Sequence, residues 1–115
     1  MGKCYDNPRK PKRKGEKVTV GGVDALPAGR GATVELNDGA EVALFNVGGK
    51  FYAIENFCPH KAAPLADSRL SGHIVECELH NWRFDVTSGE CFTKRNCSIE
   101  SYEVVVEDEM IKIVI

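Results

Sequence analysis

The chain has 115 residues and a formal net charge of −2, and hydrophobic residues make up 43% of it. A chain of this length is expected to form one domain around one modest core, which excludes a two-lobed enzyme with a deep cleft. Residues 1–15 carry six basic side chains and one acidic side chain, whereas residues 16–115 carry nine basic and sixteen acidic ones. We therefore expect an acidic body preceded by a basic arm.

The arm holds two prolines among its charges and little that is apolar, so residues 1–15 are predicted to be disordered and residues 16–115 to form the domain. The arm is interpreted as a solvated solubility tail, and docking to an acidic partner is the alternative. No apolar run could span a bilayer, and no apolar stretch follows the N-terminal charges as in a secretory signal. A cytoplasmic, thiol-reducing location is therefore expected.

From residue 17 onward the sequence is typical of short strands separated by turns. Asn37-Asp38-Gly39 is a hairpin signal, and Gly48-Gly49 marks the next turn, which predicts a three-stranded antiparallel meander. A second strand pair and a final hairpin around Asp108-Glu109 follow. Apolar residues do not recur at helical spacing, and the only helical turn the pattern allows is at Ala62–Asp67. The predicted class is all-β, with strands at Lys17–Val20, Ala32–Leu36, Ala40–Val47, Phe51–Glu55, His73–Cys77, Trp82–Val86, Tyr102–Glu107 and Met110–Ile115.

Two short segments each combine a cysteine with a histidine. Cys58-Pro59-His60 is followed, after sixteen residues, by Cys77-Glu78-Leu79-His80. Each segment can direct one thiolate and one imidazole from a loop, held by flanking strands, onto one centre. A zinc ion in a closed site and a 2Fe-2S cluster with two histidines on one iron both fit this ligand set. Zinc sites of this type usually pair like with like, so the mixed loops favour the cluster.

These segments and their flanks resemble the two cluster-binding boxes of Rieske proteins. The resemblance extends from about Val18 to Ile115 and implies three stacked antiparallel sheets, with the cluster between two loops at the tip. It implies one Rieske 2Fe-2S cluster, with Cys58, His60, Cys77 and His80 as its ligands. The flanking segments that carry the resemblance are Phe51–Ile54, Ala63–Leu65, Ile74–Glu76, Trp82–Asp85 and Thr87–Glu90.

The kind of Rieske protein is indicated by two positions. High-potential members use an extra cysteine in each box for a disulfide, and the matching residues here are Ala63 and Leu79. The chain is instead similar to soluble Rieske ferredoxins that serve multicomponent oxygenases, and in pattern to the small subunit of assimilatory nitrite reductase. Where the family usually has glycine after the second histidine, this chain has Asn81, a residue that tolerates a left-handed backbone.

The function implied is one-electron transfer from a flavoprotein reductase to a terminal oxygenase or another redox enzyme. The alternatives are a redox subunit of a larger enzyme such as nitrite reductase and a zinc-stabilised binding module. We expect a monomer with no nucleic-acid or membrane partner.

Catalysis by the chain alone is not expected. A complete oxygenase needs a second iron held by two histidines and a carboxylate, and after His60 and His80 only His73 remains, which is expected at the surface. The other cysteines are Cys4, Cys91 and Cys97. The last two could pair, but a reducing compartment favours free thiols at all three.

Overall fold

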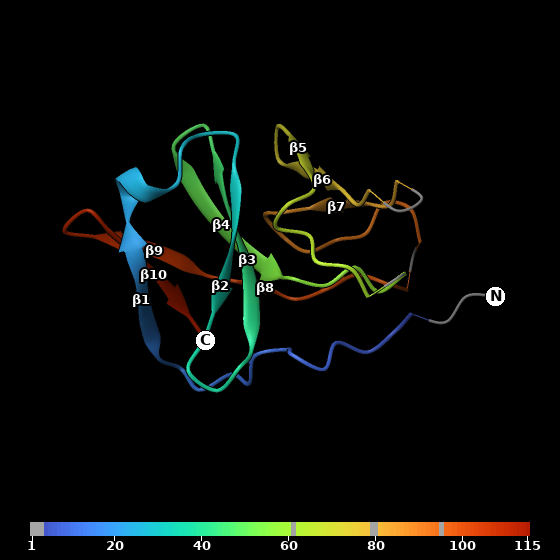
Figure 1. Cartoon of the computed structure of the whole chain (residues 1–115), viewed down its shortest axis with the longest axis horizontal. Helices are drawn as coiled ribbons and strands as arrows, with labels where there is room; N and C mark the ends of the chain where they lie inside the picture. Colours follow the sequence, from blue (N-terminus) through green and yellow to red (C-terminus); the bar gives the residue numbers. More distant parts are fainter. Residues whose placement is uncertain (1–3, 61, 79–80, 95) are drawn as a thin grey trace.

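The computed structural model describes residues 4–60, 62–78, 81–94 and 96–115, and within them ten strands form three antiparallel sheets (Figure 1). The all-β class and the three sheets expected from the sequence are confirmed. The first sheet has the order β1-β10-β9, the second β2-β3-β4-β8 and the third β5-β6-β7. The strands are β1 (Lys17–Gly22), β2 (Gly31–Glu35), β3 (Glu41–Val47), β4 (Lys50–Glu55), β5 (Arg69–Ser71), β6 (Ile74–Glu76), β7 (Arg83–Asp85), β8 (Ser101–Tyr102), β9 (Val104–Glu107) and β10 (Met110–Val114), with a short 3-10 helix at Val23–Ala25.

The predicted meander is confirmed, since β3 pairs antiparallel with both β2 and β4. Five successive residues of β3 are buried, because apolar side chains cover both of its faces. Its side chains alternate between two cores. Val42 and Leu44 belong to the core shared with the first sheet, whereas Ala43 and Phe45 belong to the core that faces the third sheet. The central strand therefore joins the supporting half of the molecule to the half that carries the two Cys–His segments.

Some expected elements differ in the structure. The strand predicted over residues 102–107 is divided, because Tyr102 pairs with Ala53 of β4 whereas Val104 pairs with Ile113 of β10. The chain thus passes from one sheet to another within two residues, and the alternating pattern on either side gives no sign of this. The three-residue β5 was not predicted. No helix forms over residues 62–67, which instead close the first Cys–His loop.

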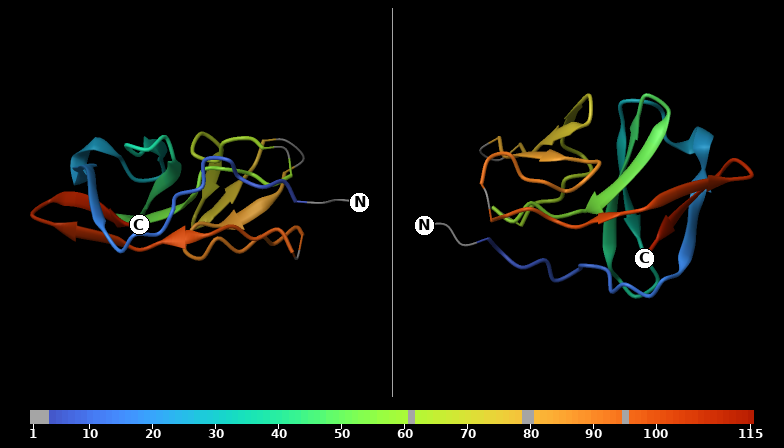
Figure 2. Two further views of the ribbon diagram at one scale, coloured as in Figure 1. Left: turned by 90° about the horizontal axis from the view of Figure 1, so that it is seen from below. Right: turned by 180° about the vertical axis from the view of Figure 1, so that it is seen from behind.

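Residues 4–15, called the strap below, run along one edge of the molecule from the third sheet to β1 (Figures 1 and 2). The structure differs here from the expected disordered arm. Pro11 is buried, the Glu41 amide donates to the Arg9 carbonyl at 3.0 Å, and the Lys14 amide donates to the Ile115 carbonyl at 2.9 Å. Low apolar content predicts disorder, but it does not predict these backbone hydrogen bonds to β3 and to the C-terminus.

Charge also attaches the strap to the acidic body. Arg9 forms an ion pair with Glu41 at 3.0 Å, and Arg13 forms one with Glu100 at 2.7 Å. The Arg13 guanidinium also lies 4.7 Å from the centre of the Tyr102 ring, a cation–π contact. Basic residues expected to be solvated are therefore partners of acidic side chains on the second sheet and on the segment leading into β8.

A disulfide joins Cys4 of the strap to Cys97, with a Cα–Cα distance of 5.6 Å. This separation lies within the normal range for a disulfide. The expectation of free thiols is therefore wrong for Cys4 and Cys97, and the considered pair of Cys91 with Cys97 does not form; Cys91 is a buried free thiol. Sequence spacing did not reveal the bridge because its two cysteines are 93 positions apart.

In the part of the chain that the structure describes, no helix is long and apolar enough to cross a membrane.

Candidate metal centre

The first Cys–His segment forms a tight loop between β4 and β5. The Cys58 amide donates to the Ala63 carbonyl at 2.7 Å, and the Ala62 amide donates to the Cys58 carbonyl at 2.7 Å. Ala62 has φ of 57°, in the left-handed region that is unfavourable for alanine. The turn keeps Cys58 fully buried while His60 is partly exposed.

The second segment forms the loop between β6 and β7. The Cys77 amide donates to the Trp82 carbonyl at 2.7 Å, so this loop also closes across five residues. Asn81 has φ of 57°, which agrees with the expectation that asparagine replaces glycine at a left-handed position. Leu79 and the expected ligand His80 lie outside the described residues.

The two loops are built alike. In each, the cysteine amide bonds the carbonyl five residues later, and the residue at the fourth position after the cysteine, Ala62 or Asn81, is left-handed. Sequence reasoning identified Asn81 but missed Ala62, because nothing about an alanine marks a left-handed position. A strained residue of this kind persists only where the surrounding structure holds it, and such residues gather at functional sites.

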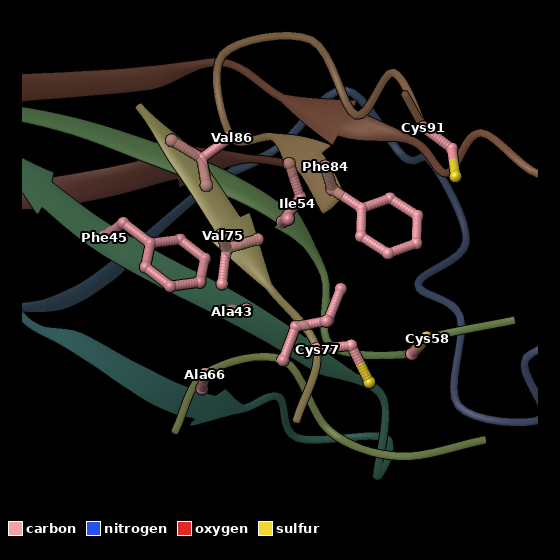
Figure 3. Close-up of a cluster of buried hydrophobic side chains, with 11 residues drawn as sticks. Ala43, Phe45, Ile54, Cys58, Ala66, Val75, Cys77, Phe84, Val86 and Cys91 are labelled. Carbon is pink, nitrogen blue, oxygen red and sulfur yellow. The ribbon is translucent and has the colours of Figure 1, made fainter. Parts of the chain in front are cut away.

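The cysteines of both loops belong to one buried cluster. Cys58 is 0% exposed and Cys77 is 1% exposed, and they share a core with Ile54, Val75 and Phe84 (Figure 3). The neighbouring side chains are apolar and exclude water from the two sulfur atoms. Two thiols from separate loops in one dry core are suited to bind a common metal atom.

The His60 ring connects the loops on the other side. It stacks on Trp82 of the second loop with ring centres 4.5 Å apart and an angle of 17° between the planes. Its Nδ1 atom is buried although the residue is partly exposed, so this nitrogen faces inward. Trp82 therefore orients a histidine of the motif.

Among the described residues, no three His, Cys, Asp or Glu side chains gather around one point, as a site for a single ion would require. The expected ligand His80 is not among these residues.

A buried asparagine supports the first loop. The Asn56 Oδ1 atom accepts hydrogen bonds from the amides of Leu65 at 2.8 Å and Ala66 at 2.9 Å. Its Nδ2 atom donates to Thr33 Oγ1 at 3.1 Å and to Glu41 Oε1 at 3.2 Å. One side chain thus ties the end of the loop to β2 and β3. Sequence reasoning missed Asn56, since a single asparagine before a cysteine has no distinctive spacing.

The turn after β7 closes the end of the β6–β7 pair that lies away from the second loop. Asp85 Oδ1 accepts hydrogen bonds from the Thr87 hydroxyl at 2.7 Å and amide at 2.9 Å, and it lies 3.1 Å from His73 Nδ1. Burial alone would raise the pKa of Asp85, but the bonds from Thr87 and the neighbouring His73 together lower it. His73 is exposed, as expected. Gly89 ends the turn with φ of 83°, where any Cβ would collide with the Ile99 carbonyl.

The family is established by comparison with known proteins. The model of the Rieske [2Fe-2S] domain matches residues 16–103. The chain therefore belongs to the Rieske [2Fe-2S] domain family, and its cofactor is a Rieske 2Fe-2S cluster. This rejects the alternative of a zinc-stabilised binding module.

Relatives of known role refine this assignment. The chain is 40% identical over 87 residues to the ferredoxin component of the naphthalene 1,2-dioxygenase/salicylate 5-hydroxylase systems of a Ralstonia species, covering 75% of this chain and 83% of the relative. A solved complex of reduced oxygenase and oxidised ferredoxin in carbazole 1,9a-dioxygenase matches with a TM-score of 0.78 at 26% identity, over 88% and 94% of the two chains. A putative NADH-dependent nitrite reductase small subunit from Mycobacterium tuberculosis also matches with a TM-score of 0.78, at 27% identity over 85% and 93%.

Proposed function

We propose that this protein is a one-electron carrier whose Rieske cluster is held by Cys58, His60, Cys77 and His80. The observation that carries the proposal is the pair of loops with the same closure, which bring two buried thiols into one core. His60, two residues after Cys58, has its Nδ1 atom facing inward. The residues present fit the cofactor of the family: two thiolates and two imidazoles are the donor set of a Rieske centre.

The cluster supplies a centre that gains and loses a single electron, and the protein controls its surroundings. Neutral imidazoles in place of two thiolates reduce the negative charge that an incoming electron meets. The apolar core around Cys58 and Cys77 keeps water away from the sulfur atoms. His60 is partly exposed and is held in one orientation by Trp82, so contact with a redox partner is expected on this side of the first loop.

The partners we propose are a flavoprotein reductase as the electron donor and a terminal oxygenase as the acceptor. The Ralstonia relative, a ferredoxin component of an oxygenase system, and the carbazole dioxygenase complex support this assignment. Residues 16–115 form the cluster domain in this proposal, which agrees with a family match that begins at residue 16. The protein acts in the cytoplasm as a monomer and does not catalyse oxygenation by itself.

A second function is supported by the similarity to the nitrite reductase small subunit. In that case the chain is a permanent subunit of a larger redox enzyme. The two functions differ in the lifetime of the complex: a carrier must leave its partner after each transfer, whereas a subunit stays bound. Affinity purification from the native source distinguishes them, since only a subunit co-purifies with a large partner in a fixed ratio.

The experiment that tests the function measures metal content and electron stoichiometry on the same anaerobic preparation. We expect two irons and two acid-labile sulfides per chain, a red-brown colour, and a reversible spectroscopic titration that fits a one-electron transition. Stoichiometric zinc without iron, or a cluster that cannot be cycled reversibly, would contradict the proposal.

A further inference from the structure

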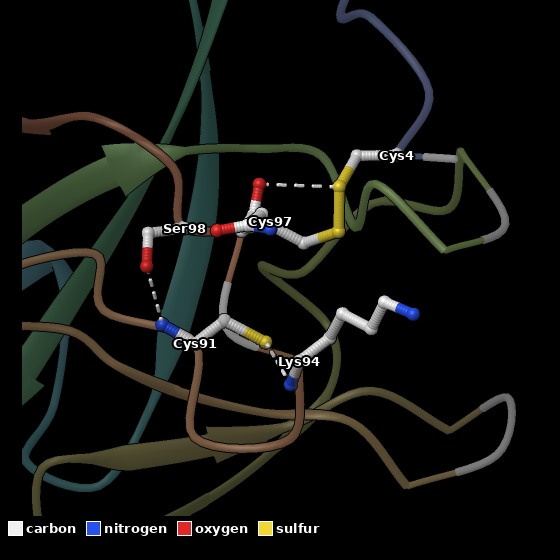
Figure 4. The surroundings of a disulfide bond; sticks show 6 residues. Cys4, Cys91, Lys94, Cys97 and Ser98 are labelled. Carbon is white, nitrogen blue, oxygen red and sulfur yellow. Dashed lines mark hydrogen bonds between the residues drawn. A yellow bond between two sulfur atoms is a disulfide. The ribbon is translucent and has the colours of Figure 1, made fainter. Parts of the chain in front are cut away.

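The disulfide at the end of the strap joins a partly exposed cysteine to a buried one (Figure 4). Cys97 is 1% exposed, whereas Cys4 is partly exposed. The Cys4 Sγ atom lies 3.3 Å from the Asn96 carbonyl oxygen. Because a disulfide sulfur carries no hydrogen, this contact is not a hydrogen bond. Cys4 and Cys97 both line a pocket of about 400 Å³, so an external thiolate can approach the bond from the side of Cys4.

The tip of the strap lies directly against the first cluster loop. The Tyr5 amide, next to Cys4, donates a hydrogen bond of 2.8 Å to the Pro59 carbonyl. Pro59 separates Cys58 from His60, the two ligands proposed in this loop. The disulfide thus holds one backbone hydrogen bond onto the middle of the Cys-Pro-His segment.

Little else holds the tip. Tyr5 is 59% exposed and Asp6 is also exposed, and pockets of about 710 Å³ and 400 Å³ are both lined by Tyr5, Asp6 and Asn7. Few apolar contacts therefore offset the entropy lost by ordering this backbone, and one hydrogen bond does not compensate for it. The disulfide is the main restraint on residues 4–6.

The rest of the strap has its own anchors. The Asn7 side chain donates to Glu55 Oε1 at 3.0 Å, Arg9 pairs with Glu41, and the Lys14 amide bonds the last carbonyl of the chain. Opening the disulfide is therefore expected to release the tip and to leave the strap in place from Asn7 onward.

We propose that Cys4–Cys97 is a thiol–disulfide exchange site, and that a dithiol reductant opens it to free the strap tip from the first cluster loop. One thiolate of the reductant attacks Cys4 Sγ, which breaks the Cys4–Cys97 bond and releases Cys97 as a thiolate that takes up a proton. The second thiolate of the reductant then attacks the reductant sulfur that is bonded to Cys4 in the mixed disulfide. This releases Cys4 as a thiolate, which is also protonated. Two electrons pass to the cysteine pair, and the reductant becomes a disulfide.

The expected compartment supports this assignment. In a reducing cytoplasm, a disulfide is usually transient, and its common roles are catalysis and redox sensing. The site rests on the proposed function in one respect, that the loop beside the tip is a cluster loop of a cytoplasmic carrier. Its consequence is that the surface next to His60 has two forms, set by the thiol state of the compartment.

The test uses the full-length, cluster-loaded protein, oxidised or treated anaerobically with dithiothreitol. Alkylation followed by mass spectrometry counts the reactive thiols, hydrogen exchange in the N-terminal peptide reports the Tyr5 amide, and the visible spectrum reports the cluster. We expect reduction to expose two further thiols and to speed exchange at Tyr5 at least about tenfold, with the Lys14 amide unchanged.

Two variants serve as controls. Cys4→Ser should give the fast Tyr5 exchange without any reductant, whereas Cys91→Ser removes a buried thiol outside the disulfide and should respond to dithiothreitol as the wild type does. If Cys4 and Cys97 are already alkylated in the oxidised protein, or if Tyr5 exchanges equally fast in both states while the cluster spectrum is intact, the exchange site is rejected and the carrier function stands. Absence of the cluster spectrum would instead reject the carrier function.

Discussion

The two cluster loops share one backbone turn but are held by different means. The first loop depends on parts of the chain outside it. The buried Asn56 side chain accepts hydrogen bonds from the amides of Leu65 and Ala66, which follow the loop, and the Tyr5 amide of the strap donates to the Pro59 carbonyl. The second loop is held by its own sheet, since β6 pairs with β7 on either side of it and the Cys77 amide bonds the Trp82 carbonyl. The same backbone turn can therefore be stabilised by a distant side chain or by adjacent strands. Substitutions near the two loops should change the stability of the protein by different amounts.

The largest effect is expected where the loops are equivalent. Cys58→Ser and Cys77→Ser each remove a proposed ligand, and each should lower the iron content of the purified protein at least about tenfold, because cluster binding needs the full donor set. Cys91→Ser is the matched control, as Cys91 is a buried cysteine of the same core and is not a proposed ligand. Full iron content in either ligand variant, or equal loss in Cys91→Ser, would contradict the ligand assignment.

The next effect separates the loops. Asn56→Ala leaves the buried amides of Leu65 and Ala66 without their acceptor and should lower the free energy of unfolding by about 3 kcal/mol. On the second loop, Arg83→Ala removes an ion pair with Glu76 at 3.7 Å, in which the Arg83 side chain is 62% exposed, and should cost less than about 1 kcal/mol. Denaturant unfolding of both variants measures the difference, and equal losses would show that the two loops are supported alike.

This contrast explains which features could be predicted from the sequence. The meander and the final hairpin follow from alternating apolar residues and turn signals, and the cluster motif follows from residue identity at close spacing. Asn56 and the disulfide between Cys4 and Cys97 depend on approaches between distant segments, and the residue type of Ala62 does not mark its left-handed backbone. Periodicity and local spacing do not predict contacts between distant segments. The Cys–His motif was therefore recognised from the sequence, whereas the contacts that support the first loop were not.

A smaller effect concerns the left-handed residue of each loop. Ala62→Gly removes the steric cost of an L-residue at φ of 57° but adds entropy to the unfolded chain, so a net stabilisation of about 0.5 kcal/mol is expected. Asn81→Gly should change stability by less, because asparagine already tolerates this conformation. Thermal unfolding of the two glycine variants makes the comparison, and a destabilised Ala62→Gly would show that the turn does not strain the alanine.

The smallest effect concerns the attachment of the strap. The hydrogen bond from Arg13 lowers the pKa of Glu100 below its ordinary value of 4.5. A lowered carboxyl pKa contributes stability above the unfolded value, and this contribution is lost as the pH falls through the folded pKa. Both side chains are about half exposed, so the difference should be about 0.5 kcal/mol or less. Arg13→Gln should flatten the pH dependence of unfolding below pH about 5, and an unchanged profile would exclude this contact.

The central claim is that both loops supply one thiolate and one imidazole to a single cluster. It is tested most directly by electron spin-echo envelope modulation spectroscopy of the one-electron-reduced protein. Two samples are compared, one with natural-abundance histidine and one with ¹⁵N-labelled histidine. The account predicts strong nitrogen couplings from two histidines, His60 and His80, which change with the isotope, and the loss of one coupling in a cluster-loaded His60→Cys variant. A spectrum without isotope-sensitive nitrogen couplings would mean that histidine does not bind the iron, and would contradict the account.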